Sequence, residues 1–415
     1  MIRSDVLVVG AGPAGSIAAL VLARAGVGVR VIDRARFPRD KLCGDTLNPG
    51  ALAMLDRLGI GARVRERAIP VEGMIVTGPR GTTVSAAYPD GLRGVAVKRA
   101  DLDLLLIAEA TAAGACFEQG IAVRAPLMEG DDRSVRGVLA RSSGAETELR
   151  ARVVIAADGR ASRLASALGL SRFAFSPRRW AFGAYFQGVT GQTARGEMHV
   201  RRDGYIGVAP LPCGLTNVCV VREIGPPEGG PHEEPESDAL ELGHGRENVG
   251  AAFRRPYRGI VANAVAADPL LRDRFANARQ VASVTTLGPL AIDSRGAGCP
   301  GLLLAGDAAG FIDPMTGDGL RFALRGGMLA AEAALRELET DQPAWRWLDA
   351  RRADEFSRKW RINRVLRRLV GSPAGVDLAA RLAAHWDAPV RYLIGVAGDI
   401  SIAQHVNSQL PTLLR

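Results

Sequence analysis

The chain begins with a strand–helix–strand pattern of hydrophobic positions. Residues 5–9 contain an unbroken Val-Leu-Val-Val run, which is typical of a parallel strand buried on both faces. Residues 13–25 are small and apolar at helical spacing, and residues 28–33 form a second apolar run that ends in Asp33. Together these segments predict one βαβ unit.

The pattern changes character twice further along the chain. Helices are expected at residues 49–58 and 99–113, and strand-like alternation at 71–84, 135–140 and 153–156. A β-rich stretch follows, with strands expected at 180–187, 196–200, 205–210 and 216–221. Residues 225–247 are rich in Pro, Gly and Glu, which predicts an exposed loop. A buried strand at 302–304, a long helix at 319–338 and a largely helical segment at 344–415 complete the chain.

This order predicts an α/β protein whose Rossmann-type domain, with a parallel central sheet, is interrupted by an antiparallel β-sheet substrate domain. We expect the first domain to comprise residues 1–70, 95–172 and 280–342. The substrate domain would comprise 71–94 and 173–279, and a helical C-terminal region would follow at 343–415.

Charge and cysteine usage narrow the function classes. The 53 Lys and Arg residues exceed the 44 Asp and Glu residues, giving a net charge of +9. This balance is compatible with an anionic cofactor, an acidic carrier protein or a membrane surface, but an Arg-rich solvated surface explains it equally simply and is the preferred interpretation. No nucleic-acid-binding motif is present. The five cysteines are scattered and no metal-ligand spacing occurs, which predicts a cytoplasmic protein without disulfides or a metal site.

The turn after the first strand carries a G-x-G-x-x-G motif, formed by Gly10, Gly12 and Gly15 with Pro13 and Ala14 between the last two glycines. Gly10 permits the tight turn, Gly12 lets the backbone approach a pyrophosphate, and Gly15 lets helix and strand pack closely. The helix N-terminus favours anions. Asp33 lies where a carboxylate would accept hydrogen bonds from the adenosine ribose, and Arg34 is assigned to the same site. The motif predicts a dinucleotide but does not separate FAD from NAD.

Two later segments make that separation. A strand at residues 153–156 leads into Asp158-Gly159, and a strand at 302–304 leads into Gly306-Asp307. With the first motif, these resemble the three fingerprints of the superfamily that contains aromatic hydroxylases, geranylgeranyl reductases and flavin halogenases.

The resemblance implies FAD as the cofactor and gives roles to individual residues. Asp307 would bond the ribityl chain, and Asp158 and Gly159 would lie beside the pyrophosphate and the approach of NAD(P)H. Arg99 matches an arginine that contacts FAD, although a surface charge at a helix start would look the same. The stretch from Pro314 to Leu320 resembles the segment beside the flavin pyrimidine ring. Within it Gly317, Gly319 and Leu320 would line the cofactor, and Pro314 is a candidate for the catalytic centre.

A Lys-x-Cys-Gly element ending in Cys43 and Gly44 resembles a loop near the flavin in geranylgeranyl reductases. Cys43 is therefore a candidate for both catalysis and cofactor binding, or else a loop residue without chemistry. The substrate sheet departs from that family. Lipid reductases carry Tyr-x-Trp-x-Phe-Pro, whereas this chain keeps Tyr205, a further catalytic candidate, and has Gly207 and Ala209 in place of the two large side chains. This change predicts a wider pocket over the flavin.

These features predict an FAD-dependent oxidoreductase acting on a lipophilic aromatic or polyketide-like small molecule. No second dinucleotide motif is present, so NADH or NADPH would dock transiently as reductant. The altered element at Tyr205 ranks monooxygenation ahead of a geranylgeranyl-reductase-like C=C reduction or dehydrogenation. A flavin halogenase or a non-catalytic FAD-fold binding protein is a further alternative. The basic, partly apolar stretch from Arg351 to Val370 could contact a membrane or an acidic carrier, or simply pack on the protein with its Arg face in water.

Overall fold

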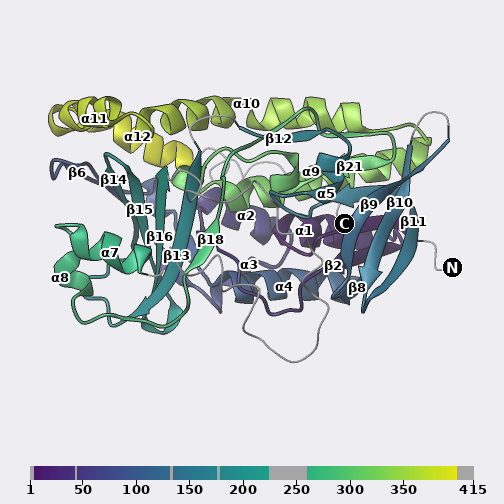
Figure 1. The fold of residues 1–415 in the computed structure, drawn as a ribbon, viewed down its shortest axis with the longest axis horizontal. Helices are drawn as coiled ribbons and strands as arrows, with labels where there is room; N and C mark the ends of the chain where they lie inside the picture. Colours follow the sequence, from purple (N-terminus) through teal and green to yellow (C-terminus); the bar gives the residue numbers. More distant parts are fainter. Residues whose placement is uncertain (1–3, 43, 131–133, 175–177, 224–258, 400–415) are drawn as a thin grey trace, which may run out of the picture.

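A mainly parallel sheet forms one half of the molecule (Figure 1). The computed structural model describes residues 4–42, 44–130, 134–174, 178–223 and 259–399. The sheet has the strand order β20-β21-β11-β1-β2-β8, and strands β1, β2, β8, β11 and β21 are mutually parallel where they pair. Their bounds are β1 Ser4–Val9, β2 Val29–Asp33, β8 Cys116–Gln119, β11 Ala145–Ala156, β20 Gly298–Cys299 and β21 Leu302–Leu304. In register, Val9 lies opposite Ala156, and Ala156 lies opposite Leu304, so three strands end side by side.

Helices cover one face of this sheet and a hairpin extends it on the other side. Helices α1 (Pro13–Arg24), α4 (Arg99–Ala112) and α9 (Gly319–Thr340) share one buried core with β1, β2 and β11. Small residues let α1 and α9 pack closely, because a Cβ at Gly327 would lie 2.3 Å from the carbonyl oxygen of Ala14. Strands β9 (Ala122–Glu129) and β10 (Ser134–Ser142) and helix α5 (Arg163–Ala167) form a second core on the opposite face.

The second sheet forms the other end of the molecule and has the order β17-β13-β16-β15-β14-β5-β6, with β18 also paired to β13. Its bounds are β5 Gly73–Thr77, β6 Thr83–Ala87, β13 Arg179–Gln187, β14 Arg195–Arg201, β15 Gly204–Leu211, β16 Leu215–Glu223, β17 Arg279–Gln280 and β18 Thr285–Leu287. Its pairs are antiparallel except β5 with β14, which are parallel. Helices α7 (Ile260–Ala267) and α8 (Arg272–Phe275) pack on one face.

Short elements connect the two halves. Strands β3 (Thr46–Leu47), β4 (Ile69–Val71) and β7 (Gly94–Ala96) form a small sheet beside α2 (Pro49–Arg57) and α3 (Gly61–Arg65). Strands β12 (Ser171–Phe173) and β19 (Ile292–Ser294) pair with each other.

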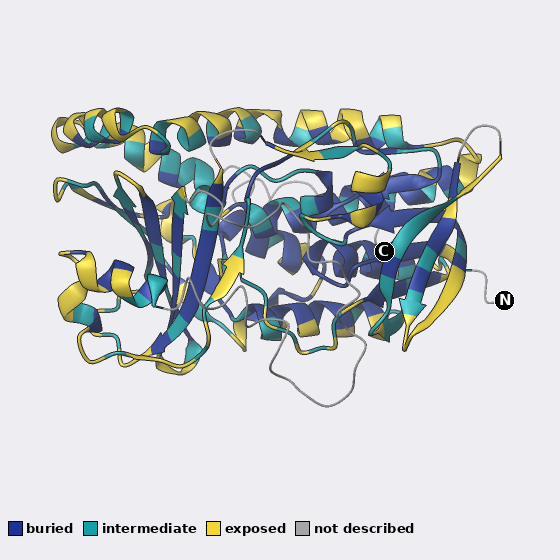
Figure 2. Cartoon of the chain, viewed as in Figure 1, coloured by how far each residue is buried: buried dark blue, intermediate teal, exposed yellow. Residues whose placement is uncertain are grey.

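Three C-terminal helices lie over both halves, namely α10 (Trp345–Val370), α11 (Pro373–His385) and α12 (Ala388–Ala397) (Figures 1 and 2). The end of α12 joins the start of α2, because Asn48 Nδ2 donates to the carbonyl of Ala397 at 2.6 Å and the Gly50 amide donates to Gly398 at 3.1 Å. A buried ionic cluster secures this joint. Lys359 of α10 pairs with Asp318 at 2.6 Å and with Asp399 at 2.9 Å.

The predicted fold class is confirmed. The expected elements are present, generally within one to three residues of their predicted ends, although the strand expected at 153–156 begins eight residues earlier because its first part pairs with β10. The domain boundaries stay a prediction. The loop expected at 225–247, residues 400–415 of the expected helical segment and the residue Cys43 lie outside the described residues. Among the helices described, none combines the length and hydrophobicity that crossing a membrane requires.

Candidate functional site

The ends of three parallel strands bring the three glycine-containing turns together. Gly10 follows β1, Asp158 and Gly159 follow β11, and Gly306 follows β21. A Cβ on Gly10 would lie 2.4 Å from the carbonyl oxygen of Ala157, and a Cβ on Gly15 would lie 1.9 Å from that of Gly10. The two glycines are therefore required by close packing between the first turn, the start of α1 and the end of β11.

The start of α1 is suited to an anion. Gly12 is its N-cap, Pro13 and Ala14 open the helix, no side chain caps it, and no acidic residue lies in its first turn. The unpaired N–H groups and the positive end of the helix dipole favour a phosphate at this position.

Asp33 and Arg34 lie at the end of β2, beside the first turn. The two carboxylate oxygens of Asp33 accept hydrogen bonds from the Ala11 and Ala35 amides, each at 2.8 Å. Asp33 therefore holds the backbone of the glycine turn, whatever else it binds. Its contact with an adenosine ribose stays a prediction, as does the role of Arg34.

The second and third turns contain polar atoms that fit a dinucleotide. Gly159 (φ +87°) and Gly306 (φ +60°) both adopt the left-handed conformation. Within the described part of the chain, the buried atoms Asp158 Oδ1 and Arg160 Nε have no hydrogen-bond partner. Burial raises the pKa of Asp158. Buried polar groups normally have partners, so these atoms and the uncapped α1 are consistent with bound FAD. Asp307 lies in the short 3-10 helix η4 (Gly306–Ala309) of the third turn.

Arg99 is fully buried at the start of α4, which excludes the surface-charge interpretation. Its guanidinium makes a bidentate pair with Asp103, at 2.9 Å and 2.8 Å, and Arg39 reaches the same carboxylate at 3.1 Å. Arg99 thus anchors α4 and the loop that precedes α2, and its contact with FAD stays a prediction.

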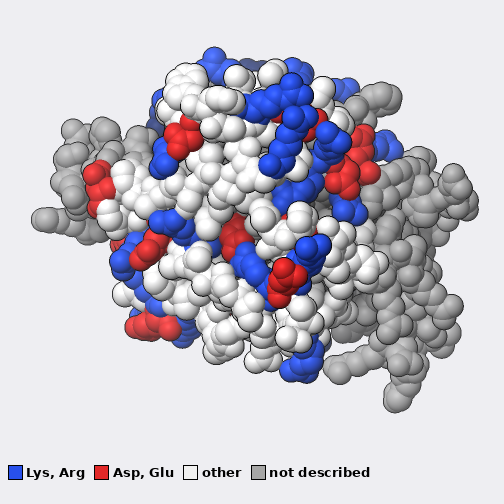
Figure 3. Space-filling model, turned by 90° about the vertical axis from the view of Figure 1, so that its left-hand side faces the viewer, with Lys and Arg blue, Asp and Glu red and all other residues white. Residues whose placement is uncertain are grey.

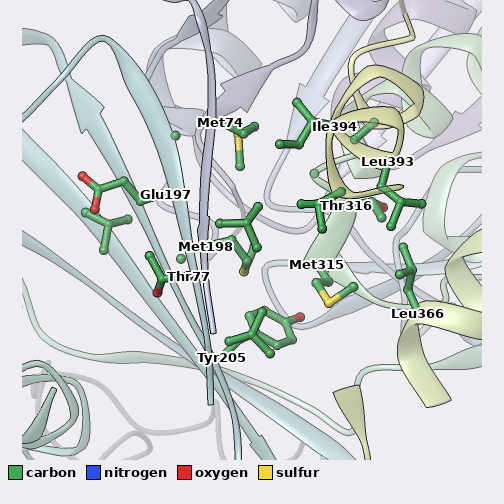
Figure 4. A pocket seen from close by; sticks show the side chains of 18 of the residues that line it. Met74, Thr77, Glu197, Met198, Tyr205, Met315, Thr316, Leu366, Leu393 and Ile394 are labelled. Carbon is green, nitrogen blue, oxygen red and sulfur yellow. The ribbon is translucent and has the colours of Figure 1, made fainter. Parts of the chain in front are cut away.

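An elongated apolar cavity of about 300 Å³ lies between the second sheet and the C-terminal helices (Figure 4). Met74 and Met198 from the sheet face Met315, Leu393 and Ile394 across it. Gly207 and Ala209 line its wall, and a Cβ at Gly207 would meet nothing closer than a backbone oxygen 3.8 Å away. The positions where large side chains were missing in the sequence are therefore open to this cavity.

The turn at Pro314–Thr316 (η5) and Gly317 forms one end of the cavity. Gly317 adopts φ +67°, and α9 begins at Gly319 with Leu320 buried behind it. Asp318, just before α9, is buried and binds Lys359 and Asn48. The predicted flavin-side segment therefore lies at the junction between the cavity and the α1–α9 core.

Tyr205 is buried, and its side chain forms part of the cavity wall near Met315. Its hydroxyl donates to Asp313 Oδ1 at 2.6 Å, the same oxygen accepts the Met315 amide at 3.0 Å, and Arg179 pairs with Asp313 Oδ2 at 3.0 Å. Burial and the charge of Asp313 raise the pKa of Tyr205 well above its usual range. Tyr205 therefore keeps its proton and fixes the turn that carries Pro314.

Asp45 is one of two buried carboxyl groups in the cavity wall, with Glu197, and sequence reasoning missed it. Its Oδ1 accepts the Arg99 amide at 3.0 Å, and its Oδ2 accepts from Asn217 Nδ2. Burial raises the pKa of Asp45 from 3.8 to about 6, against the opposing effects of Asn217 and Arg99. Its place directly after Gly44, which also lines the cavity, was the only sequence feature that could have drawn attention to it.

Two described residues of the Lys-x-Cys-Gly element, Lys41 and Gly44, lie near the Gly159 turn and the cavity respectively. Lys41 Nζ is 3.9 Å from the point where a Gly159 side chain would begin, and Gly44 reaches the cavity. No cluster of metal-ligating side chains occurs in the described parts of the chain.

Comparison with known proteins places the chain among flavoproteins. A family model described as an FAD binding domain matches residues 3–219. The menaquinone reductase of Mycobacterium tuberculosis is 32% identical over 386 residues, covering 89% of this chain and 85% of the relative. Digeranylgeranylglycerophospholipid reductase 2 of Methanopyrus kandleri is 28% identical, covering 99% and 98% of the two chains. A flavin-dependent brominase has a similar structure, with a TM-score of 0.77, 19% identity and 98% coverage of both chains, which shows the fold alone.

Proposed function

Because this chain belongs to the geranylgeranyl reductase and menaquinone reductase family of FAD-dependent oxidoreductases, we propose that it reduces a carbon–carbon double bond in a lipophilic, isoprenoid-type substrate. The observation that carries the proposal is Asp45, a buried carboxyl in the wall of an apolar cavity that ends at the turn of Pro314–Thr316; the other buried carboxyl of the wall, Glu197, is already paired with Arg274. Two relatives that match most of the chain are named as reductases, of menaquinone and of a digeranylgeranyl lipid. The sequence-based preference for monooxygenation stays a prediction.

The cavity walls would bind and orient the substrate. Methionine side chains from the sheet and from the turn adapt to an irregular aliphatic chain, and the apolar lining excludes water from the reacting bond. Gly207 and Ala209 leave room for a broader group than the family pattern Tyr-x-Trp-x-Phe-Pro would allow. This supports a substrate that differs in width from the lipid substrates of reductases that carry that pattern.

Bound FAD would supply the hydride, held by the turns at Gly10, Gly159 and Gly306 and by Asp307. Saturating a double bond also requires a proton on the second carbon. Asp45 is placed to hold that proton at its carboxyl oxygen, because its pKa of about 6 makes the neutral form accessible near pH 7. Asn217 and the Arg99 amide fix the carboxyl orientation.

Arg99 and Tyr205 would act as positioning residues in this scheme, because each holds a backbone segment rather than a reacting atom. Pro314 would shape the turn beside the flavin, and the role of Cys43 in catalysis or cofactor binding stays a prediction from the sequence. NADH or NADPH is proposed as the transient reductant. The stretch from Arg351 to Val370 is retained as a contact with a membrane or an acidic carrier.

A single-turnover experiment tests the proposal. The purified holoprotein is reduced with NADPH or NADH without oxygen, and a menaquinone or a geranylgeranyl lipid is added while flavin absorbance is followed. Reoxidation by the acceptor, with a product heavier by two hydrogens, is expected. Reoxidation by oxygen alone, with a product heavier by one oxygen atom, would instead support monooxygenation and refute the proposal.

A further inference from the structure

Helix α11 is apolar on two sides. Val376, Ala379, Ala380 and Ala383 line the cavity. Leu378 and Leu382, four residues apart on the helix, and Trp386, just past its end, form a separate row that is 58%, 60% and 66% exposed. Figure 2 shows the outward side of this helix as exposed. A helix that only covered the cavity would present polar residues to water on that side.

Val365 near the end of α10 and Tyr392 of α12 are exposed large hydrophobic residues on the two helices that contact α11. We call Val365, Leu378, Leu382, Trp386 and Tyr392 the C-terminal apolar patch. They are the most exposed of the large hydrophobic side chains in the described residues, at 55–66%, whereas the others of this class reach at most 41% and are scattered over the molecule. Because the three helices are consecutive and pack together, the exposure is concentrated at one end of the fold.

Unpaired basic side chains lie on the same helices as the patch, α10 and α11. Arg361, Arg364, Arg368 and Arg381 are exposed and form no ion pair with any described residue. The acidic residue of α11 and the acidic N-cap residue of α12 are already paired, Asp377 with Arg202 at 2.9 Å and Asp387 with Arg391 at 2.7 Å. Figure 3 shows basic side chains gathered on the upper part of this face, where the C-terminal helices lie.

We infer that the C-terminal apolar patch is the surface through which the protein rests on an anionic lipid bilayer, with α11 separating the bilayer from the substrate cavity. Leucine side chains would enter the boundary between headgroups and acyl chains, Trp386 and Tyr392 would lie at the headgroup level, and the unpaired arginines would meet lipid phosphates. The inference rests on the proposed function, because membrane contact would allow a lipophilic substrate to enter the cavity beside α11 without crossing water. Most of the apolar residues in this contact lie on α11 and after it, and not in the stretch from Arg351 to Val370 that the sequence predicted. Leu366 and Leu369 of that stretch face the cavity instead.

Vesicle binding tests the inference without any substrate. The full-length holoprotein is mixed with vesicles of phosphatidylcholine alone, or of phosphatidylcholine with phosphatidylglycerol, and bound protein is separated by flotation. Binding is expected to the anionic vesicles and to weaken as salt rises. Leu382→Ser should lower the partition coefficient about tenfold or more, because burying one leucine side chain contributes about 1.5–3 kcal/mol. Arg364→Gln with Arg368→Gln should reduce the salt dependence.

Leu270→Ser is the matched control and should bind like the wild type. Leu270 is an exposed leucine between α7 and α8, away from the C-terminal helices. Flavin absorbance and the melting temperature show that each variant is folded. Absence of binding to either vesicle, or equal binding by wild type and Leu382→Ser, would overturn the inference. A wild-type dimer that Leu382→Ser converts to a monomer in sedimentation would overturn it too, because the patch would then face a second copy. Vesicle binding without reductase activity would leave this inference standing and the proposed function refuted.

Discussion

Replacing Asp45 by Asn removes a buried charge while keeping the shape of the side chain. The carboxyl lies fully buried between Arg99, Asn217 and the apolar cavity. In Asp45→Asn the amide oxygen can still accept the Arg99 amide, and the Asn217 amide can turn to accept from the new N–H group. The variant therefore removes the ionisable group and keeps partners for Arg99 and Asn217, while the hydrogen bond between Tyr185 and Asp45 is the contact that it changes.

The size of the effect follows from the pKa. Burial raises the pKa of Asp45 from 3.8 to about 6, so the folded state holds the proton more tightly than the unfolded state. The stabilisation from this protonation is fully present below pH 3.8 and is lost as pH rises through about 6. The loss amounts to about 3 kcal/mol at pH 8 and about 1.5 kcal/mol at pH 5, at 1.36 kcal/mol per pKa unit. Asp45→Asn should thus become more stable relative to the wild type by about 1.5 kcal/mol between pH 5 and pH 8.

Denaturant unfolding of both proteins at the two pH values measures this difference, with exposed Asp56→Asn as the control that should show no such change. A stability difference that is the same at both pH values would refute a carboxyl titrating near 6. In turnover, the variant should lose about 100-fold or more in substrate reduction, the usual size of a general-acid effect, while flavin reduction by NAD(P)H is unchanged. Wild-type turnover should fall as pH rises through about 6, and a variant with wild-type turnover would refute the acid role.

Three further substitutions test the site. Gly207→Trp should raise KM for a long-chain substrate about tenfold or more without loss of FAD, because the new side chain would project into the open cavity. An unchanged KM would contradict the substrate assignment. Gly15→Ala should lose FAD affinity and about 1–3 kcal/mol or more of stability, because its Cβ would lie 1.9 Å from the Gly10 oxygen. Flavin absorbance and melting temperature measure the two effects, and Gly207→Ala is the control that should be tolerated in both assays. Arg99→Gln should lower the free energy of unfolding by about 3–5 kcal/mol in denaturant titration, because Asp103 would keep only Arg39 as a partner. The control Arg65→Gln, at an exposed ion pair, should lower it by at most about 1 kcal/mol. Equal losses in the two variants would contradict a buried pair at Arg99.

The cofactor half of the site was predictable because its chemistry is local in the sequence. A strand, a glycine turn and a helix occupy neighbouring positions at Gly10, and the turns at Asp158 and Gly306 follow strands that read as continuous apolar runs. Parallel strands end on the same edge, so recognising the three strands is enough to bring these turns together.

The cavity half was not predictable in the same way. Asp45, Asn217 and Met315 are far apart in the chain and meet only because the second sheet packs against the α2 and α9 starts. The parallel pairing of β5 with β14 was not predictable either, because it depends on the direction in which the chain enters the second sheet. The sequence showed that Gly207 and Ala209 lacked bulk, and the structure adds which helices form the opposite wall.

Because the end of α12 is bonded to Asn48 and Gly50 at the start of α2, we expect that the C-terminal segment can be exchanged between relatives as a unit. Residues 373–397 supply one wall of the cavity in a single continuous stretch, whereas the cofactor turns come from residues before 320. Chimaeras that exchange this stretch between relatives while keeping Lys359, Asp318 and Asp399 should therefore exchange substrate preference and leave the flavin environment intact. The wall that faces these helices, with Gly207 and Ala209, would stay unchanged in such chimaeras and would still set the width of the cavity.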